Sequence, residues 1–240
     1  MLSLPTLPVN LQANLQALHE RITKAARAAG RDPSSVRLLA VSKTFPATVL
    51  AEAARAGQRA FGENYVQEAV EKIDALAGSA HQPLEWHFIG PIQSNKTRTI
   101  AERFDWVQSV DRLKIAERLA EQRPPNMPEL NVLLQVNVSG EATKAGVALE
   151  ALSSLAAAVA RLPRLRLRGL MAIPAPEADV ARQRIAFART NELFHRLRAD
   201  GLPLDTLSIG MSDDLEAAIA EGSTMVRIGT ALFGARAASQ

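Results

Sequence analysis

One lysine stands where a predicted strand gives way to a predicted helix, in the stretch LLAVSKTFPATVL from Leu38 to Leu50. The run from Val36 to Ser42 is rich in apolar residues and predicts a buried strand, and Pro46 suits the first position of a helix. Lys43 therefore lies at the C-terminal end of the strand. A lysine there is most often a solvated surface residue, but an amine at the edge of the core can also bond covalently to a carbonyl compound.

Two glycine-containing turns near the end of the chain predict a site for an anion. In SIGMSDD, residues 208–214, a glycine turn leads into a helix N-terminus, where free N–H groups and the helix dipole would face the anion. In RIGTA, residues 227–231, Gly229 allows close approach of the backbone and Thr230 adds a hydroxyl. Glycines after strands are usually only turns, and residues 212–214 suit a helix cap equally well, so both interpretations stay open here.

Arg227 is the third residue that could do chemistry. It falls within MVRIG, in a predicted strand, where a guanidinium needs a partner. An amine that faces a phosphate cradle suggests a Schiff base with a phosphorylated aldehyde, which fits both a phosphosugar aldolase and a pyridoxal phosphate protein. In the second case Arg227 would donate to the pyridine nitrogen. Because arginine keeps its proton, that nitrogen would stay unprotonated.

The elements that must position these residues alternate between strands and helices. A helix over residues 11–29 comes first, and strands follow over residues 36–42, 59–64, 85–90, 104–110, 131–138, 165–173, 204–210 and 224–230. Helical patterns lie between them, over residues 46–56, 65–76, 92–103, 112–122, 149–162, 179–201 and 215–222. The α/β pattern predicts a TIM (β/α)8 barrel with an extra N-terminal helix. A doubly wound open sheet is the alternative, but it usually has fewer strands, and no G-x-G-x-x-G motif follows the first strand.

A barrel would bring the polar strand ends together. In this fold the active site lies at the C-terminal ends of the strands, and phosphate often binds in the loops after strands seven and eight. Asn64 and Met171 end the second and sixth predicted strands, and His87 lies near the end of the third. We therefore expect all three on the same rim as Lys43, opposite the anion cradle.

Composition narrows the class of protein. The 240 residues, 47% of them hydrophobic, suit one large domain or two small ones, and we expect a single domain over residues 1–240 with residues 1–10 flexible. The lack of cysteine excludes disulfides and thiol chemistry and suits a reducing compartment, the cytoplasm. The net charge of +3 comes from interspersed charges, which argues against nucleic-acid binding. We expect no secretory signal and no membrane partner.

Six blocks carry a family resemblance in order along the chain. They are AVSKTFP, FGENYVQE, WHFIGPIQSNK, VNVSGEATKAG, RGLMAIP and LSIGMSDDLEAAIAEGSTMVRIGTALFG. Together they resemble the pyridoxal phosphate homeostasis protein family, also called YggS/PROSC, from about Val36 to Gly234. Any one block alone would be weak evidence, but six in order are specific.

The resemblance implies a single-domain barrel like the N-terminal domain of bacterial alanine racemase, with pyridoxal 5'-phosphate (PLP) bound as an internal aldimine to Lys43. It implies that the cofactor is bound by Lys43, Asn64, Met171, Ser208, Ser212, Arg227, Gly229 and Thr230. Of these, residues 208, 212, 229 and 230 would contact the phosphate, and Arg227 would lie near the pyridine nitrogen. It further implies a protein without established enzymatic activity that holds PLP, limits its free concentration and delivers it to PLP-dependent apoenzymes. We expect the protein to be a monomer.

A racemase-like PLP enzyme is the alternative. Racemisation by two bases needs a proton donor on each face of the cofactor, and in alanine racemase the second base is a tyrosine from an additional C-terminal domain. The sequence ends six residues after Gly234 and is expected to lack that domain, and Tyr65 is its only tyrosine. An unprotonated pyridine is also a weaker electron sink. A phosphosugar aldolase would need acid and base carboxylates beside Lys43, and only Glu63 ends a neighbouring strand.

Overall fold

Eight parallel strands close into a barrel in the order in which they occur along the chain, with β8 paired to β1. The computed structural model describes residues 10–78, 83–139, 145–175, 177 and 179–234. The strands are β1 (Arg37–Val41), β2 (Ala60–Glu63), β3 (Glu85–Phe88), β4 (Trp106–Val110), β5 (Leu130–Gln135), β6 (Leu165–Met171), β7 (Thr206–Ser208) and β8 (Met225–Ile228). The predicted TIM barrel is confirmed.

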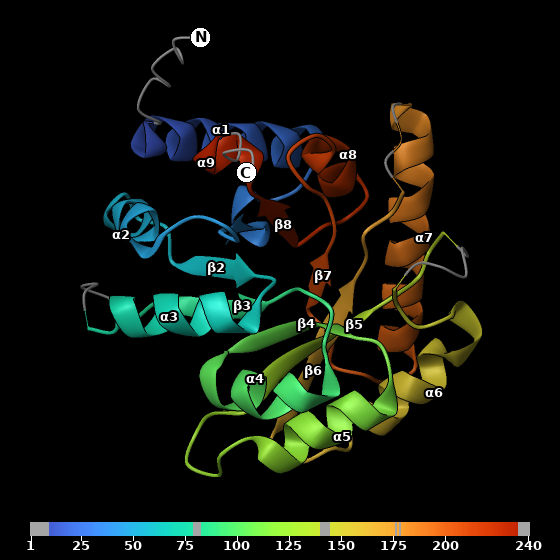
Figure 1. The fold of residues 1–240 in the computed structure, drawn as a ribbon. Coiled ribbons are helices and arrows are strands. Elements are labelled where there is room, and N and C mark those ends of the chain that lie inside the picture. Colours follow the sequence, from blue (N-terminus) through green and yellow to red (C-terminus); the bar gives the residue numbers. More distant parts are fainter. Residues whose placement is uncertain (1–9, 79–82, 140–144, 176, 178, 235–240) are drawn as a thin grey trace, which may run out of the picture.

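Helices alternate with the strands and lie around the barrel (Figure 1). They are α2 (Ala47–Arg55), α3 (Val66–Leu76), α4 (Thr97–Arg103), α5 (Leu113–Gln122), α6 (Leu149–Val159), α7 (Val180–Ala199), α8 (Leu215–Ala220) and α9 (Thr230–Phe233), with short 3-10 turns at Pro33–Ser35 and Ser94–Lys96. Each longer helix turns an apolar stripe toward the sheet, as Ile115, Ala116 and Leu119 of α5 do, all fully buried. This burial supplies most of the stability of such helices.

The extra helix predicted before the first strand is α1, Leu11–Ala28. Its N-terminus is capped by Asn10, whose side chain accepts a hydrogen bond of 3.0 Å from the N–H of Ala13. One stripe of the helix is buried at three- and four-residue spacing, namely Leu11, Leu15, Leu18, Ile22 and Ala26. Of the segment 1–10, which we expected to be flexible, only Asn10 lies within the described residues.

Helix α1 also holds the two elements that follow the last two strands. Figure 1 shows it alongside α8 and α9. The side chain of Asn14 donates to the carbonyl of Leu232 in α9 at 2.9 Å. Arg21 pairs with Glu216 of α8 at 2.9 Å and donates to the carbonyl of Ser212 at 3.3 Å. The N-terminal helix therefore braces the loops at the C-terminal ends of β7 and β8.

Several predicted boundaries differ from the structure, and two of these differences lie beside the cavity residues. Pro46 is not the first helical residue: its backbone is extended, with ψ of 158°, and α2 begins at Ala47. The last strand ends at Ile228, where its pairing with β1 ends, rather than at residue 230. The chain then turns at Gly229, and Thr230 begins the short helix α9. This second difference matters because it moves Thr230 from a strand to the start of a helix.

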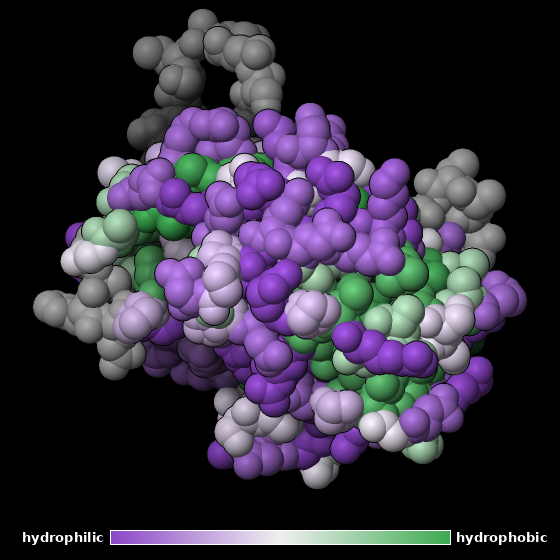
Figure 2. Space-filling view, turned by 90° about the horizontal axis from the view of Figure 1, so that it is seen from below, coloured by the Kyte–Doolittle hydropathy of each residue, from purple (hydrophilic) through white to green (hydrophobic). Residues whose placement is uncertain are grey.

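The surface seen from below is mostly hydrophilic (Figure 2). A hydrophobic area lies at the right of this view, on the side where Figure 1 places α6 and α7. Isolated apolar areas of this kind are ordinary on folded proteins. Across the described parts of the chain, no helix combines the length and the apolar character needed to cross a membrane.

Candidate functional site

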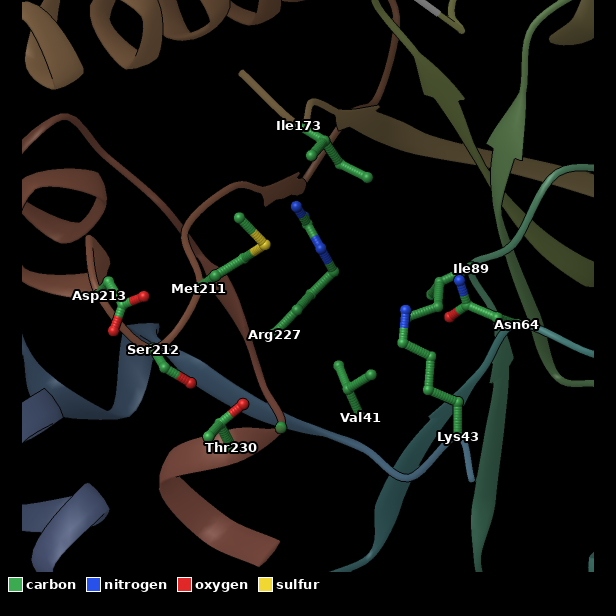
Figure 3. Close-up of a pocket in the computed structure, with 11 residues that line it drawn as sticks. Val41, Lys43, Asn64, Ile89, Ile173, Met211, Ser212, Asp213, Arg227 and Thr230 are labelled. Carbon is green, nitrogen blue, oxygen red and sulfur yellow. The ribbon is translucent and has the colours of Figure 1, made fainter. Parts of the chain in front are cut away.

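A cavity of about 230 Å³ opens at the C-terminal ends of the strands (Figure 3). Its walls come from β1, β8 and the loops after β1, β2, β3, β6, β7 and β8. The lining residues are Val41, Lys43, Asn64, Ile89, Ile173, Met211, Ser212, Asp213, Arg227, Gly229 and Thr230. Barrel geometry predicts this location for a binding site.

An amine and a pair of hydroxyls lie on opposite sides of this cavity. Figure 3 shows Lys43 beside Asn64 on one side, and Ser212 and Thr230 on the other, with Arg227 between the two groups. Lys43 follows β1 by two residues, and Thr230 stands at the start of α9. The arrangement suits a ligand that carries a carbonyl group at one end and an anion at the other.

A buried ammonium group fixes the peptide groups on both sides of Lys43. The Nζ of Lys72 donates to the carbonyl of Ser42 at 2.8 Å and to the carboxylate of Glu68 at 2.5 Å. The same Glu68 oxygen accepts the N–H of Thr44 at 2.5 Å. Thr44 has φ of +71°, a left-handed conformation that costs a residue other than glycine on the order of 1 kcal/mol or more. These bonds therefore hold a strained turn directly after Lys43.

The same ammonium neutralises Glu63. The two side chains are 2.8 Å apart, and 5% of Lys72 and none of Glu63 is exposed. Ser42 donates its hydroxyl to the bonded Glu63 oxygen at 2.5 Å, and the other oxygen has no partner among the described residues. Burial raises the pKa of Glu63, although the hydrogen bonds from Lys72 and Ser42 oppose the shift. Glu63 does not line the cavity, so the carboxylate that an aldolase would need is not placed for that chemistry.

Arg227 is buried in the barrel, with 4% of the residue exposed. Its Nη1 donates to the carbonyl and the hydroxyl of Ser208, at 2.5 and 2.8 Å, and its Nη2 donates to the carbonyl of Ala172 at 2.9 Å. Burial lowers the pKa of Arg227 to about 10, and the charge of Asp214 opposes this shift. The guanidinium is therefore charged at neutral pH and held in one orientation.

The wall of the cavity that faces Lys43 carries the predicted anion site. Asp214 precedes α8, but its side chain accepts the N–H of Met211 at 2.5 Å instead of capping the helix. The hydroxyl of Ser212 accepts the N–H of Ala231 at 3.4 Å, which joins the loop after β7 to the first turn of α9. Leu232 and Phe233 of α9 already donate their N–H groups to the carbonyl of Gly229. Within the described residues, the N–H groups of Gly229 and Thr230 and the two hydroxyls of this wall are left to donate to an anion.

Six of the eight predicted residues line the cavity, namely Lys43, Asn64, Ser212, Arg227, Gly229 and Thr230. Ser208 and Met171 are not among the lining residues, and both are fully buried. Ser208 lies behind Arg227 in the hydrogen-bond network, and Met171 packs with Trp106 and Leu133. The structure therefore separates residues that touch the cavity from residues that support it.

The sequence did not single out Val41, Ile89, Ile173 or Met211 as site residues, although each lies at a strand end or in the loop that follows. The rule that selected Lys43 would have found them if apolar residues had been included. The expectation for His87 was wrong. Its side chain is fully buried inside the barrel, where it bonds to Glu85 and Gln108 instead of joining the rim.

The fold and the position of the cavity indicate which class of protein this chain belongs to. Residues 13–237 match the family described as alanine racemase, N-terminal domain. Alanine racemase from Corynebacterium glutamicum shares the fold with a TM-score of 0.64 at 20% identity, covering 94% of this chain and 63% of that one. The chain is thus a barrel of the alanine racemase N-terminal type.

Relatives with higher sequence identity identify the family within this class. The pyridoxal phosphate homeostasis protein of Pseudomonas aeruginosa is 66% identical over 93% of this chain and 94% of its own length, and that of Escherichia coli K12 is 58% identical over 93% and 95%. PipY of Synechococcus elongatus, solved with PLP bound, has a TM-score of 0.82 at 37% identity and covers 94% of this chain and all of its own. The chain belongs to the pyridoxal phosphate homeostasis protein family.

Proposed function

We propose that this protein binds PLP, limits the free concentration of this reactive aldehyde in the cytoplasm, and delivers it to apoenzymes. One observation carries the proposal: the cavity sets an amine on one side, hydroxyls and helix-start N–H groups on the other, and a buried guanidinium between them. PLP carries an aldehyde, a phosphate and a pyridine nitrogen on one rigid ring. The PLP-bound PipY and the names of the relatives support the assignment.

The groups of the cavity fit this cofactor. Asn64 lines the cavity, and its side-chain oxygen is buried and has no hydrogen-bond partner within the described residues. A buried polar atom of this kind is costly unless a ligand or water satisfies it. The hydroxyls of Ser212 and Thr230 and the backbone at Gly229 would hold the phosphate. Arg227 would donate an N–H to the ring nitrogen.

Lys43 would hold the cofactor covalently. Its amine adds to the aldehyde carbon, a carbon–nitrogen double bond forms, and one water molecule leaves. The strained turn at Thr44 and the bonds from Lys72 to Ser42 and Glu68 keep the lysine backbone in place. Any amine that enters the cavity can exchange with Lys43, which gives the cofactor a route out.

We propose that the protein has no catalytic role of its own and acts as a monomer. When bound, PLP supplies an electron sink, but a charged arginine at the ring nitrogen leaves that nitrogen unprotonated and weakens the sink. Tyr65, the one tyrosine, is 57% exposed and does not line the cavity, so it is not placed as a second base. A racemase-like enzyme is the alternative that the fold allows.

Reductive trapping tests the attachment. The protein loaded with PLP and treated with borohydride should carry a pyridoxyl group on Lys43, located by peptide mass spectrometry. Lys114, exposed on α5, is the internal control and should stay unmodified. A pyridoxyl group found mainly on another lysine would overturn the assignment.

Delivery needs a separate assay. Loaded protein, freed of unbound PLP by gel filtration, is mixed with an apo PLP enzyme, and recovery of that enzyme's activity is followed with and without a scavenger of free PLP. Recovery that survives the scavenger indicates direct transfer. If no activity returns over hours while the cofactor stays bound, the delivery role is wrong and only storage is left.

A further inference from the structure

A chain of polar side chains crosses the interior of the barrel and ends at Arg227. It runs from Glu85 and His87 on β3 through Gln108 on β4 and Ser208 on β7. Of these, His87, Gln108 and Ser208 are fully buried. Buried polar groups in a barrel interior are expensive, and they are tolerated only when each one is hydrogen-bonded.

The direction of each hydrogen bond in this chain is determined by Glu85. Its Oε1 lies 2.7 Å from the Nε2 of His87 and accepts from Arg37 at 2.6 Å. Burial alone would raise the pKa of Glu85, but the hydrogen bonds from His87 and Arg37 and the positive charge of Arg37 hold it below its usual range. The carboxylate is therefore ionised, and Nε2 must carry the ring proton. Burial lowers the pKa of His87, so the ring is neutral and its Nδ1 is an acceptor.

This tautomer orients Gln108. An accepting Nδ1 of His87 requires a donor, and the Nε2 of Gln108 lies 2.9 Å away. The amide oxygen then faces Ser208 and accepts its hydroxyl proton at 2.7 Å. If the amide of Gln108 were flipped, its N–H₂ group would face the hydroxyl of Ser208. Its oxygen would then face the unprotonated Nδ1 of His87, and neither atom could donate to the other. Only one orientation satisfies all three residues.

The orientation of Ser208 in turn restrains Arg227. Because the hydroxyl proton goes to Gln108, the oxygen lone pairs of Ser208 face the guanidinium, 2.8 Å from Nη1. The hydroxyl and the carbonyl of Ser208 accept the two hydrogens of Nη1, and the carbonyl of Ala172 accepts one hydrogen of Nη2. Within the described residues, the second hydrogen of Nη2 and the Nε–H are left for a ligand.

We propose that His87 and Gln108 are positioning residues, which act through Ser208 to aim a remaining N–H of Arg227 at the ring nitrogen of the bound cofactor. The inference rests on the proposed function, because it assumes that PLP occupies the cavity. It extends the site beyond the cavity wall, since neither His87 nor Gln108 lines the cavity.

The test compares PLP with its 1-deaza analogue, in which C–H replaces the ring nitrogen. A hydrogen bond from a charged donor should make the wild-type protein prefer PLP by about tenfold to a hundredfold. In Gln108→Met, which keeps the shape of the side chain but removes its hydrogen bonds with His87 and Ser208, the preference should fall to within about threefold of unity. Gln58→Met is the matched control, because Gln58 is also buried, but its side chain donates, among the described residues, only to the carbonyls of Leu38 and Ala60.

The outcomes separate the two proposals. If the wild-type protein binds PLP but does not prefer it over the deaza analogue, Arg227 does not act at the ring nitrogen, and both its assigned role and this inference are wrong. If the wild-type protein shows the preference and Gln108→Met retains it, the positioning role alone is wrong. If Gln108→Met does not fold, Ser208→Ala replaces it in the same comparison, and a retained preference again overturns the inference. A loss in Gln58→Met equal to that in Gln108→Met would mean a general effect of core damage.

Discussion

Replacing Lys72 by methionine is expected to remove several kcal/mol of stability. The ammonium is 5% exposed and makes three hydrogen bonds of 2.5 to 2.8 Å, to Ser42, Glu63 and Glu68. Without it, Glu63 keeps a fully buried charge whose second oxygen already has no partner among the described residues. Breaking a buried ion pair on one side costs about 3–5 kcal/mol, which lowers the folding equilibrium constant by roughly a hundredfold or more.

The pH dependence of the stability lost in Lys72→Met tests whether the buried charge of Glu63 causes the loss. Burial raises the pKa of Glu63 above its unfolded value, and loss of Lys72 raises it further. A carboxyl group with a raised folded pKa takes up a proton more readily in the folded state, so the deficit of Lys72→Met should be largest near pH 8 and shrink as the pH falls toward 5. Urea unfolding at several pH values measures it.

A second substitution provides the control. Lys72→Met combined with Glu63→Gln removes the orphaned charge and should recover part of the lost stability at pH 8, while losing the pH dependence. If Lys72→Met costs less than about 1 kcal/mol at pH 8, or its cost is the same at pH 5, a buried charge pair does not hold this strand end.

Further predictions concern the residues proposed to bind the phosphate, the proposed lack of catalysis and the stability of the protein in acid. Thr230→Val removes one hydroxyl and should weaken PLP binding about tenfold to a hundredfold in a fluorescence titration; Gly229→Val should weaken it more, and unchanged affinity in both would place the phosphate elsewhere. Incubation of loaded protein with L-alanine in heavy water should give no α-deuteration at enzyme-like rates, which NMR measures, and rapid exchange would favour the racemase alternative. The loss of stability that Glu85 contributes in acid should begin below about pH 4.5 and grow toward pH 2, because the lowered pKa of Glu85 stabilises the fold by about 1–2 kcal/mol after discount for partial exposure; Glu85→Gln should flatten that part of the curve.

The sequence alone determined the architecture and the position of the amine. Strands and helices alternate eight times, and parallel strands joined by helices close into a barrel whose functional residues follow the strands. That rule selected Lys43, Asn64, Ser212, Gly229 and Thr230 without knowledge of any contact between them. It works because the position of a residue along a strand is a local property, which periodicity and turn residues report.

Only the tertiary structure decided which side chains face one another. The strands of this barrel are buried on both faces, so their apolar runs do not tell an inward residue from an outward one. His87 was therefore expected at the rim but lies inside, and Ser208 was expected at the cofactor but bonds to Gln108, one hundred residues away. Pairings over such separations depend on how the barrel closes, which no local pattern of residues encodes. The role of Lys72 was not predicted from the sequence either, because it depends on how helix α3 packs against the strand ends at Ser42 and Glu63.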